Sequence, residues 1–232
     1  MESNILLKYM EKRFNTKKEP KKTENPGPVI TISRETGCPA ERIAKQLALS
    51  LNKRKESKSP HWKCVSKEIL KESAKELELN PSQIKYVFDF EQRGAWDDIM
   101  SSFSTKYYKS DRKIRKTIAE VIRTIAEQGN VIIIGRGSVA ITRDMPNAFH
   151  VNLEAPLDWR TEMIAIKYNM KPDEARQFAI ETDKNRMKFR ESFYGRSTDY
   201  TRFDVTYNCM TFTDDEIIKS ITSLLLIRGM IK

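Results

Sequence analysis

The run Val131–Ile134, with the sequence Val-Ile-Ile-Ile, constrains the fold more than any other part of the chain. β-branched residues in unbroken succession predict a strand that is buried on both faces, because a strand with one solvated face would alternate apolar and polar residues. Such strands belong mainly to parallel sheets that helices cover on both sides. The run therefore favours an α/β fold.

Strand and helix patterns alternate along the rest of the chain. An amphipathic helix that stops at Gly129 is predicted just before this run, with an apolar face made of Ile114, Ile118, Val121, Ile122 and Ile125. Other strands are predicted at 29–32, 62–65, 148–153 and 203–207, and other helices after Pro39, at about 157–168, at about 172–193, and after a capping box of Thr213 and Glu216. This order predicts a parallel sheet with helices on both faces, whose ligands bind at the carboxyl ends of the strands.

Composition narrows the partners. The chain has 232 residues and a formal net charge of +10, which favours a polyanionic partner: nucleic acid, an acidic membrane surface or the phosphates of a nucleotide. No apolar run approaches the roughly 20 residues that cross a bilayer, and the N-terminus does not resemble a signal peptide, so we expect a cytoplasmic protein without a membrane partner. The cysteines Cys38, Cys64 and Cys209 lack zinc-site spacing, and no metal site is predicted.

The domain organisation follows from a change of pattern near Pro28. Residues 1–27 are expected to form an appendage, a short helix followed by a lysine-rich linker. Residues 28–232 should form one α/β domain.

The first loop at the predicted ligand edge joins the strand at 29–32 to the helix after Pro39. A phosphate-binding loop at this place would wrap an anion with backbone N–H groups and a helix N-terminus. Of the GxxxxGK[ST] pattern, only one interior glycine is present, and an ordinary strand–turn–helix joint is the alternative. The candidate phosphate-binding residues are Arg34, Thr36, Gly37, Cys38, Ala40 and Arg42.

The second loop at this edge, Gly135–Ala140, fits the dinucleotide pattern GxGxxA, with Glu154 at the end of the next strand. A crossover helix of a dinucleotide-binding unit needs more room than the short segment before Pro146 offers. Arg136, flanked by glycines, better suits a cation offered to a phosphate.

The third candidate lies in a basic segment near the end of the helix at 172–193. Arg186 and Arg190 are four residues apart and share a helix face, and Arg196 follows in a polar loop. Arginines on a closing lid can neutralise the charge of a phosphoryl group in transfer, and these three are the candidate catalytic residues. A solvated basic helix face is the alternative.

Taken in order, these segments resemble the cytidylate-kinase-like branch of the nucleoside monophosphate kinases. The resemblance spans about 29–220 and is carried by Ile32-Ser33-Arg34-Glu35-Thr36-Gly37, Gly135-Arg136-Gly137, Arg143-Asp144-Met145-Pro146-Asn147, Ala155-Pro156-Leu157-Asp158-Trp159-Arg160, Asp183-Lys184-Asn185-Arg186 and Phe203-Asp204-Val205.

The resemblance implies a three-layer P-loop kinase fold with a five-stranded parallel sheet, a helical nucleotide-binding insertion at about 67–128 and a lid at about 183–202. It implies transfer of the γ-phosphoryl group of ATP, with Mg²⁺, to a monophosphate such as CMP. Arg136 and Asp144 would bind the acceptor nucleotide, backbone amides of 35–40 would hold the donor, and the lid arginines would close over the phosphates.

The chain departs from the larger kinase family at the phosphate loop. Ala40 stands where the loop lysine belongs, and Glu41 stands in the place of the magnesium-binding Ser or Thr. Arg34 or Arg42 could replace the lysine only by turning back over the loop. A catalytically silent nucleotide-binding or regulatory protein is therefore the main alternative, and a nucleic-acid-binding protein is a weaker one.

Overall fold

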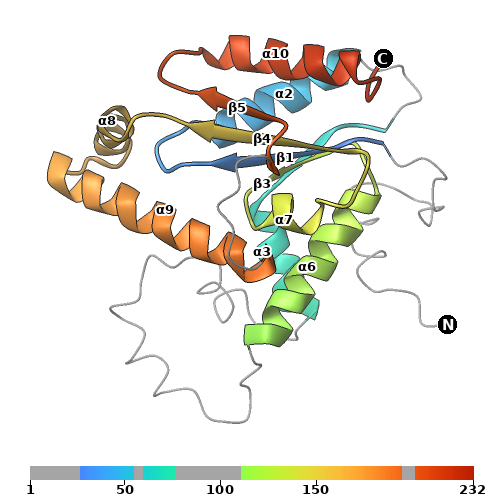
Figure 1. Cartoon of the computed structure of the whole chain (residues 1–232), viewed down its shortest axis with the longest axis horizontal. Helices are drawn as coiled ribbons and strands as arrows, with labels where there is room; N and C mark the ends of the chain where they lie inside the picture. Colours follow the sequence, from blue (N-terminus) through green and yellow to red (C-terminus); the bar gives the residue numbers. More distant parts are fainter. Residues whose placement is uncertain (1–26, 55–59, 77–110, 195–201) are drawn as a thin grey trace.

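The computed structural model describes residues 27–54, 60–76, 111–194 and 202–232, drawn in colour in Figure 1. A five-stranded sheet forms the centre of the molecule, with every pair of neighbouring strands parallel. Its strand order is β2-β3-β1-β4-β5. The strands are β1 (Val29–Arg34), β2 (Lys63–Val65), β3 (Val131–Ile134), β4 (Ala148–Glu154) and β5 (Val205–Asn208).

Helices connect the strands and cover both faces of the sheet (Figure 1). One face carries α2 (Ala40–Arg54) and α10 (Asp214–Ile227), and the other carries α3 (Lys67–Glu76), α6 (Asp111–Glu127) and the short α7 (Ser138–Ile141). The remaining helices, α8 (Leu157–Tyr168) and α9 (Pro172–Tyr194), pack on each other beyond the end of β4. The three-layer parallel α/β architecture predicted from the sequence is confirmed.

The central strand β1 lies between β3 and β4, in register with Ile30 opposite both Ile132 and Phe149. Since side chains alternate between the faces of a strand, Ile30 and Ile132 join the cluster under α2 and α10. Val29 and Val131 join the cluster under α3 and α6. Two hydrophobic cores therefore fix the sheet from opposite sides.

The pattern-based elements agree closely with the structure. The helix predicted to stop at Gly129 is α6, and Gly129 has the left-handed φ of 68° that suits a residue just beyond a helix. The capping box of Thr213 and Glu216 is present at the start of α10. The predicted strand at 203–207 begins later, at Val205, and the strand predicted at 62–65 begins at Lys63.

The room argument against a dinucleotide-binding unit is confirmed. After β3 the chain forms only the four-residue helix α7 before it enters β4. The strand β4 then pairs with β1 and β5 instead of lying beside β3, so no β3–helix–β4 nucleotide unit exists.

Several sequence-based expectations lie outside the described residues. They are the N-terminal helix and linker within 1–26, residues 77–110 of the expected nucleotide-binding insertion, and residues 195–201 of the expected lid. Within the described residues, α3 and α6 lie at the two ends of the expected insertion, and the end of α9 lies within the expected lid. None of the described helices combines the length and apolar character needed to cross a membrane.

Candidate functional site

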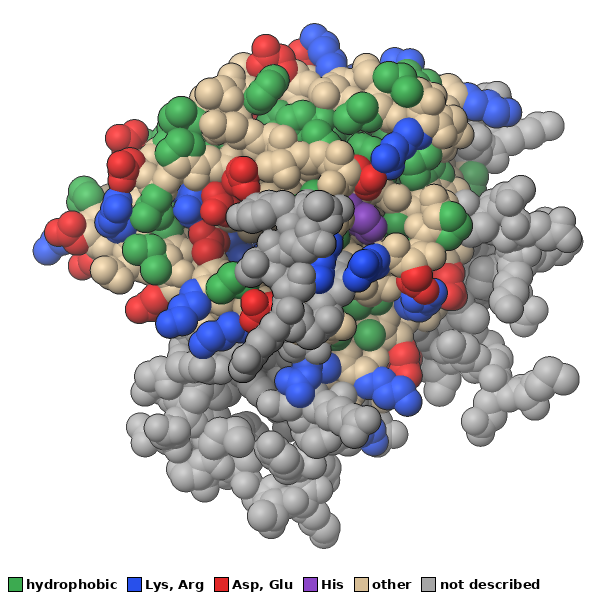
Figure 2. Space-filling model, viewed as in Figure 1, with side chains coloured by type: hydrophobic (Ala, Val, Ile, Leu, Met, Phe, Trp, Pro, Cys, Tyr) green, Lys and Arg blue, Asp and Glu red, His purple; other side chains and the backbone are tan. Residues whose placement is uncertain are grey.

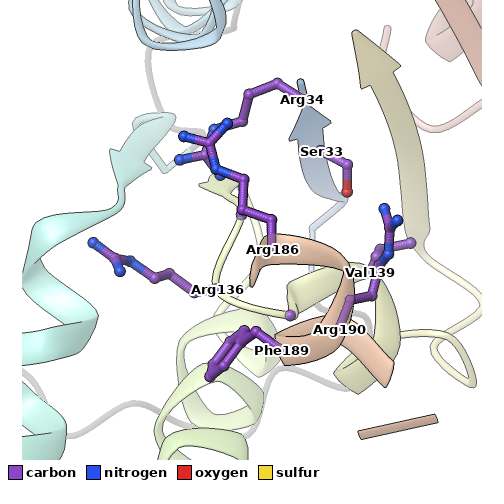
Figure 3. Close-up of a pocket in the computed structure, with 9 residues that line it drawn as sticks. Ser33, Arg34, Arg136, Val139, Arg186, Phe189 and Arg190 are labelled. Carbon is purple, nitrogen blue, oxygen red and sulfur yellow. The ribbon is translucent and has the colours of Figure 1, made fainter. Parts of the chain in front are cut away.

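A pocket opens where the carboxyl ends of the neighbouring strands β1 and β3 meet α9. This position is the crevice at which open α/β sheets usually bind ligands, because the chain leaves these two strands toward opposite faces. Figure 3 shows the side chains that surround it. The lining comprises Ser33, Arg34, Gly135, Arg136, Gly137, Val139, Arg186, Phe189 and Arg190.

Arginines from three separate segments meet in this pocket. Arg34 comes from β1, Arg136 from the turn after β3, and Arg186 and Arg190 from α9. In Figure 3 the guanidinium groups of Arg34 and Arg186 converge, whereas Arg136 and Arg190 extend to opposite sides. The structure thus brings together the predicted acceptor-side arginine, two predicted lid arginines and one arginine of the predicted phosphate loop.

The turn that carries Arg136 has an unusual backbone. Gly135, Arg136 and Gly137 have φ angles of 63°, 60° and 70°, so three consecutive residues adopt the left-handed conformation. Glycine adopts this conformation freely, but the backbone of an arginine is strained in it. Space is also limited, since a Cβ at Gly135 would lie 1.9 Å from Nη1 of Arg34. The left-handed φ favours glycine at both flanking positions, and at Gly135 an added Cβ would also displace the end of the Arg34 side chain.

The arginines are close enough that each one disfavours the charged form of its neighbours. Burial, together with the nearby Arg186 and Arg136, lowers the pKa of the Arg34 guanidinium to about 9. The group stays charged at neutral pH, so the pocket holds positive charge that an anion would stabilise. A polar, positively charged crevice of this kind fits a phosphate group.

The arginines on α9 are held by different neighbours. Nη1 of Arg186 donates a hydrogen bond of 2.8 Å to Oγ1 of Thr36 in the first loop. The guanidinium of Arg190 lies over the ring of Phe203, 5.8 Å from its centre. Arg196, the third predicted lid arginine, lies outside the described residues.

The first loop is tied to α9 through Asp183. Oδ1 of Asp183 accepts hydrogen bonds from the amide and the hydroxyl of Thr36, both of 2.7 Å. Oδ2 accepts a 2.7 Å hydrogen bond from the buried guanidinium of Arg160. Thr36 is therefore held by Asp183 and Arg186, which both lie on α9.

Arg160 connects this network to the end of the sheet. It donates to the carbonyls of Thr36 and Ala155 and lies 3.2 Å from the carboxylate of Glu35. The loop passes so close to α8 that a Cβ at Gly37 would lie 2.9 Å from both Cβ and the carbonyl oxygen of Arg160. With a φ of 101°, Gly37 is required for both its backbone and its size.

The other predicted loop residues lie away from the pocket. Cys38 packs against the core under α2, where its thiol shares a hydrogen bond with Cys209, and this contact and burial raise the pKa of Cys38. Ala40 is buried at the start of α2. The exposed Arg42 forms an ion pair with Asp214 at the start of α10. Of the two arginines considered as replacements for the missing lysine, only Arg34 faces the pocket.

Asp144 is not placed with Arg136. It is exposed and forms a two-pronged ion pair with Arg123 of α6, with distances of 2.9 and 2.7 Å. Asp144 precedes Asn147 by three residues, and the carbonyl of Asn147 accepts a hydrogen bond from the amide of Val29 at the amino end of β1. Asp144 therefore belongs to the edge of the sheet opposite the pocket.

Asp183 and Arg160 were not among the predicted site residues, although both lie in motifs that carried the resemblance. The sequence offered one usable signal for Arg160, which lies in the first turn of the helix predicted after the strand at 148–153. Phe189 of α9 was also missed. It is buried and packs edge-to-face on Phe193, 5.2 Å between ring centres, so it forms an apolar wall of the pocket.

The described side chains do not form a metal site of their own. No group of three or more His, Cys, Asp or Glu residues among them is placed to hold a metal ion. The carboxylates nearest the first loop, Glu35 and Asp183, are both paired with Arg160. Any Mg²⁺ at this site would therefore be held mainly by the phosphates of a bound nucleotide, as is common for this ion.

Comparisons with known proteins agree with the observed fold. The model of the cytidylate kinase-like family matches residues 29–209. An uncharacterized protein from Eubacterium ventriosum ATCC 27560 has a similar structure, with a TM-score of 0.61 and 19% identity over 85% of this chain and 98% of that one. At this identity the likeness concerns the fold alone. No curated protein matches the chain.

More distant structural matches include two kinases. They are a shikimate kinase from Bacteroides thetaiotaomicron (TM-score 0.49, 14% identity, covering 85% of this chain and 98% of that one) and a gluconokinase from Sinorhizobium meliloti 1021 (TM-score 0.45, 12% identity, covering 88% and 97%).

Proposed function

The chain belongs to the cytidylate kinase-like family, and from this premise we propose that it is a nucleotide-binding phosphotransferase. The proposed reaction moves the γ-phosphoryl group of ATP to a nucleoside monophosphate such as CMP. The observation that carries the proposal is that Arg34, Arg136 and Arg186 line one pocket at the carboxyl ends of β1 and β3.

The arginines suit the chemistry of phosphoryl transfer. An oxygen of the acceptor phosphate attacks the γ-phosphorus while the bond to the oxygen of ADP breaks. The acceptor oxygen is already an anion, so no general base is needed. The demand on the protein is to position two anionic groups and to stabilise the charge spread over the transferred group. Arg136 would hold the acceptor phosphate, and Arg186 and Arg190 would stabilise the transferred one.

The arginines that line the pocket form a local cluster of cations, which is all that the phosphates of a nucleotide need. A groove for nucleic acid would need basic side chains in a continuous stripe. Figure 2 shows both acidic and basic side chains on the described part of the face in view.

The proposal is tested by coupling ADP release to a spectrophotometric readout. The purified protein is mixed with ATP and Mg²⁺, and CMP, dCMP, UMP, AMP and GMP are added one at a time. ADP release that depends on one of these monophosphates supports the proposal. Hydrolysis of ATP without an acceptor is the blank, and equal rates with and without monophosphate contradict phosphoryl transfer.

The second candidate is a nucleotide-binding protein without turnover. It is favoured by Ala40 in the place of the loop lysine and by the carboxylate of Asp183 at the amide of Thr36. Thermal unfolding with the same nucleotides separates the candidates. A rise in melting temperature without ADP release supports the protein without turnover. If the nucleotides cause neither a rise in melting temperature nor ADP release, both candidate functions are excluded.

A further inference from the structure

The carboxylate of Asp183 has the contacts that a bound phosphate would have in a loop of this kind. A loop between the first strand and the first helix of such folds offers N–H groups to an anion. Here the amide and hydroxyl of Thr36 are both directed at a single oxygen, Oδ1 of Asp183. Arg186 donates to the same hydroxyl and lies 3.5 Å from the same carboxylate oxygen.

Most other amides of this loop are also engaged. The amide of Glu35 donates to the carbonyl of Leu153, that of Cys38 to the carbonyl of Glu35, and that of Ala40 to the carbonyl of Cys38. Pro39 has no N–H. A polyphosphate cannot reach the amide of Thr36 while Asp183 holds it.

The carboxylate that occupies the loop and the arginine beside it come from the same helix. Asp183 and Arg186 are three residues apart, so they lie on one face of α9 and approach the loop together. The side chain of Asp183 keeps 22% of its surface exposed, so a ligand can reach it from solvent. An anion that displaces this carboxylate would meet Thr36, Arg160 and Arg186, the groups that Asp183 now contacts.

We propose that Asp183 is a latch: it occupies the donor-phosphate position of the first loop as an internal anion and must leave before a polyphosphate binds there. The inference rests on the proposed function, since it takes this loop as the donor side of the site. It adds an autoinhibitory contact between α9 and the loop. The ligand class that opens the latch is an inorganic or nucleotide polyphosphate.

The test compares two variants that each remove one negative charge beside Arg160. Asp183→Ala removes both the charge and the acceptor of the Thr36 amide, whereas Glu35→Gln removes a charge that does not touch this amide. Inorganic pyrophosphate is titrated into each protein by calorimetry. The titrations are run at pH 8, because burial raises the pKa of the Glu35 carboxyl and both carboxylates must be ionised.

We expect Asp183→Ala to bind pyrophosphate about 10- to 100-fold more tightly than the wild type, the gain from a freed amide hydrogen bond to a charged group. Glu35→Gln should gain less than about 3-fold, as expected for a general change of charge. In ¹⁵N spectra of Asp183→Ala, the signal of the Thr36 amide should shift when pyrophosphate saturates the protein. Equal gains in both variants, or no gain in Asp183→Ala, would overturn the latch.

A measurement on the wild type tests the latch even if the Asp183 variant fails to fold. Hydrogen exchange of the Thr36 amide should be slow without any ligand, because Asp183 already accepts its hydrogen bond. Rapid exchange would show that the latch does not form. Neither experiment needs turnover, so a lack of ADP release defeats the proposed reaction and leaves the latch to be judged separately.

Discussion

At the scale of single residues, the site depends on backbone conformations that few side chains tolerate. Arg136 adopts a φ of 60° between two glycines, a conformation that costs about 1–2 kcal/mol in a residue with a Cβ. Hydrogen bonds of the turn stabilise this conformation. The amide of the neighbouring Gly135 donates to the carbonyl of Ile32, and the carbonyl of Gly135 accepts from the amide of Ser138. Strain that the fold maintains at the edge of a ligand pocket points to a functional position.

The prediction at this scale concerns the side chain of Arg136. Arg136→Ala should weaken binding of CMP by about 10- to 100-fold, because a charge-assisted hydrogen bond to a phosphate contributes about 1.5–3 kcal/mol. Arg136→Gly should lose binding equally while relieving the backbone strain. Calorimetric titration with CMP measures both.

The matched control is Arg143→Ala, which removes an exposed arginine beyond α7. It should bind CMP as the wild type does. If Arg143→Ala and Arg136→Ala lose affinity alike, only the general positive charge of the protein matters, and the acceptor role of Arg136 is wrong.

At the scale of elements, the pairing of β1 with β4 carries a buried polar contact. Thr31 and His150 are opposite one another in the register, and Oγ1 of Thr31 lies 2.7 Å from Nδ1 of His150. Burial lowers the pKa of His150, although the nearby Asp204 acts in the opposite direction. The central strands are thus joined by a histidine that the folded protein holds more weakly protonated than the unfolded chain does.

This contact predicts a loss of stability in mild acid. The unfolded chain binds the proton more readily, so the contribution of His150 is complete above its unfolded pKa of about 6.5 and is lost as the pH falls below that value. Urea unfolding at pH 7.5 and 5.5 should show a larger fall in the free energy of unfolding for the wild type than for His150→Asn.

The control for this experiment is His61→Asn, which changes the other histidine of the chain at an exposed position. It should keep the pH dependence of the wild type. An unchanged dependence in His150→Asn would assign the effect to other groups.

At the scale of the whole molecule, Arg160 joins parts of the chain that the sequence separates widely. It reaches the end of β4 through Ala155, the first loop through Thr36 and Glu35, and α9 through Asp183. Only 6% of its surface is exposed. The ligand edge of the sheet is therefore assembled around one buried cation and two carboxylates.

Removal of this cation should destabilise the entire domain. Arg160→Met removes the donor to the carbonyls of Ala155 and Thr36 and leaves the partly exposed Glu35 and Asp183 without their shared partner, which should cost about 1–3 kcal/mol. The midpoint of urea unfolding should fall accordingly.

Arg176→Met is the comparison, because Arg176 of α9 forms an exposed pair with Asp158 of α8. Such exposed pairs contribute less than about 1 kcal/mol. Similar losses in the two variants would mean that the Arg160 network is not a main contributor to stability.

The sequence by itself determined the elements and their order. Apolar runs such as Val131–Ile134 and the periodic faces of α6 and α10 are local patterns, and they act over a few residues whatever the rest of the chain does. The short segment between Gly137 and Pro146 likewise excluded a dinucleotide-binding unit before the strand order was known. The flanking glycines also marked Arg136 as a phosphate-binding candidate, and it does line the pocket.

Only the tertiary structure decided which charged side chains meet. Thr36 and Asp183 are 147 residues apart, and their contact arises because β1 and β4 are neighbours and α8 turns α9 back toward the first loop. The same topology directs Arg42 to Asp214 and Asp144 to Arg123, away from the pocket. The packing of whole helices and strands decides which distant partners a long side chain contacts, and local sequence patterns carry no information about this packing.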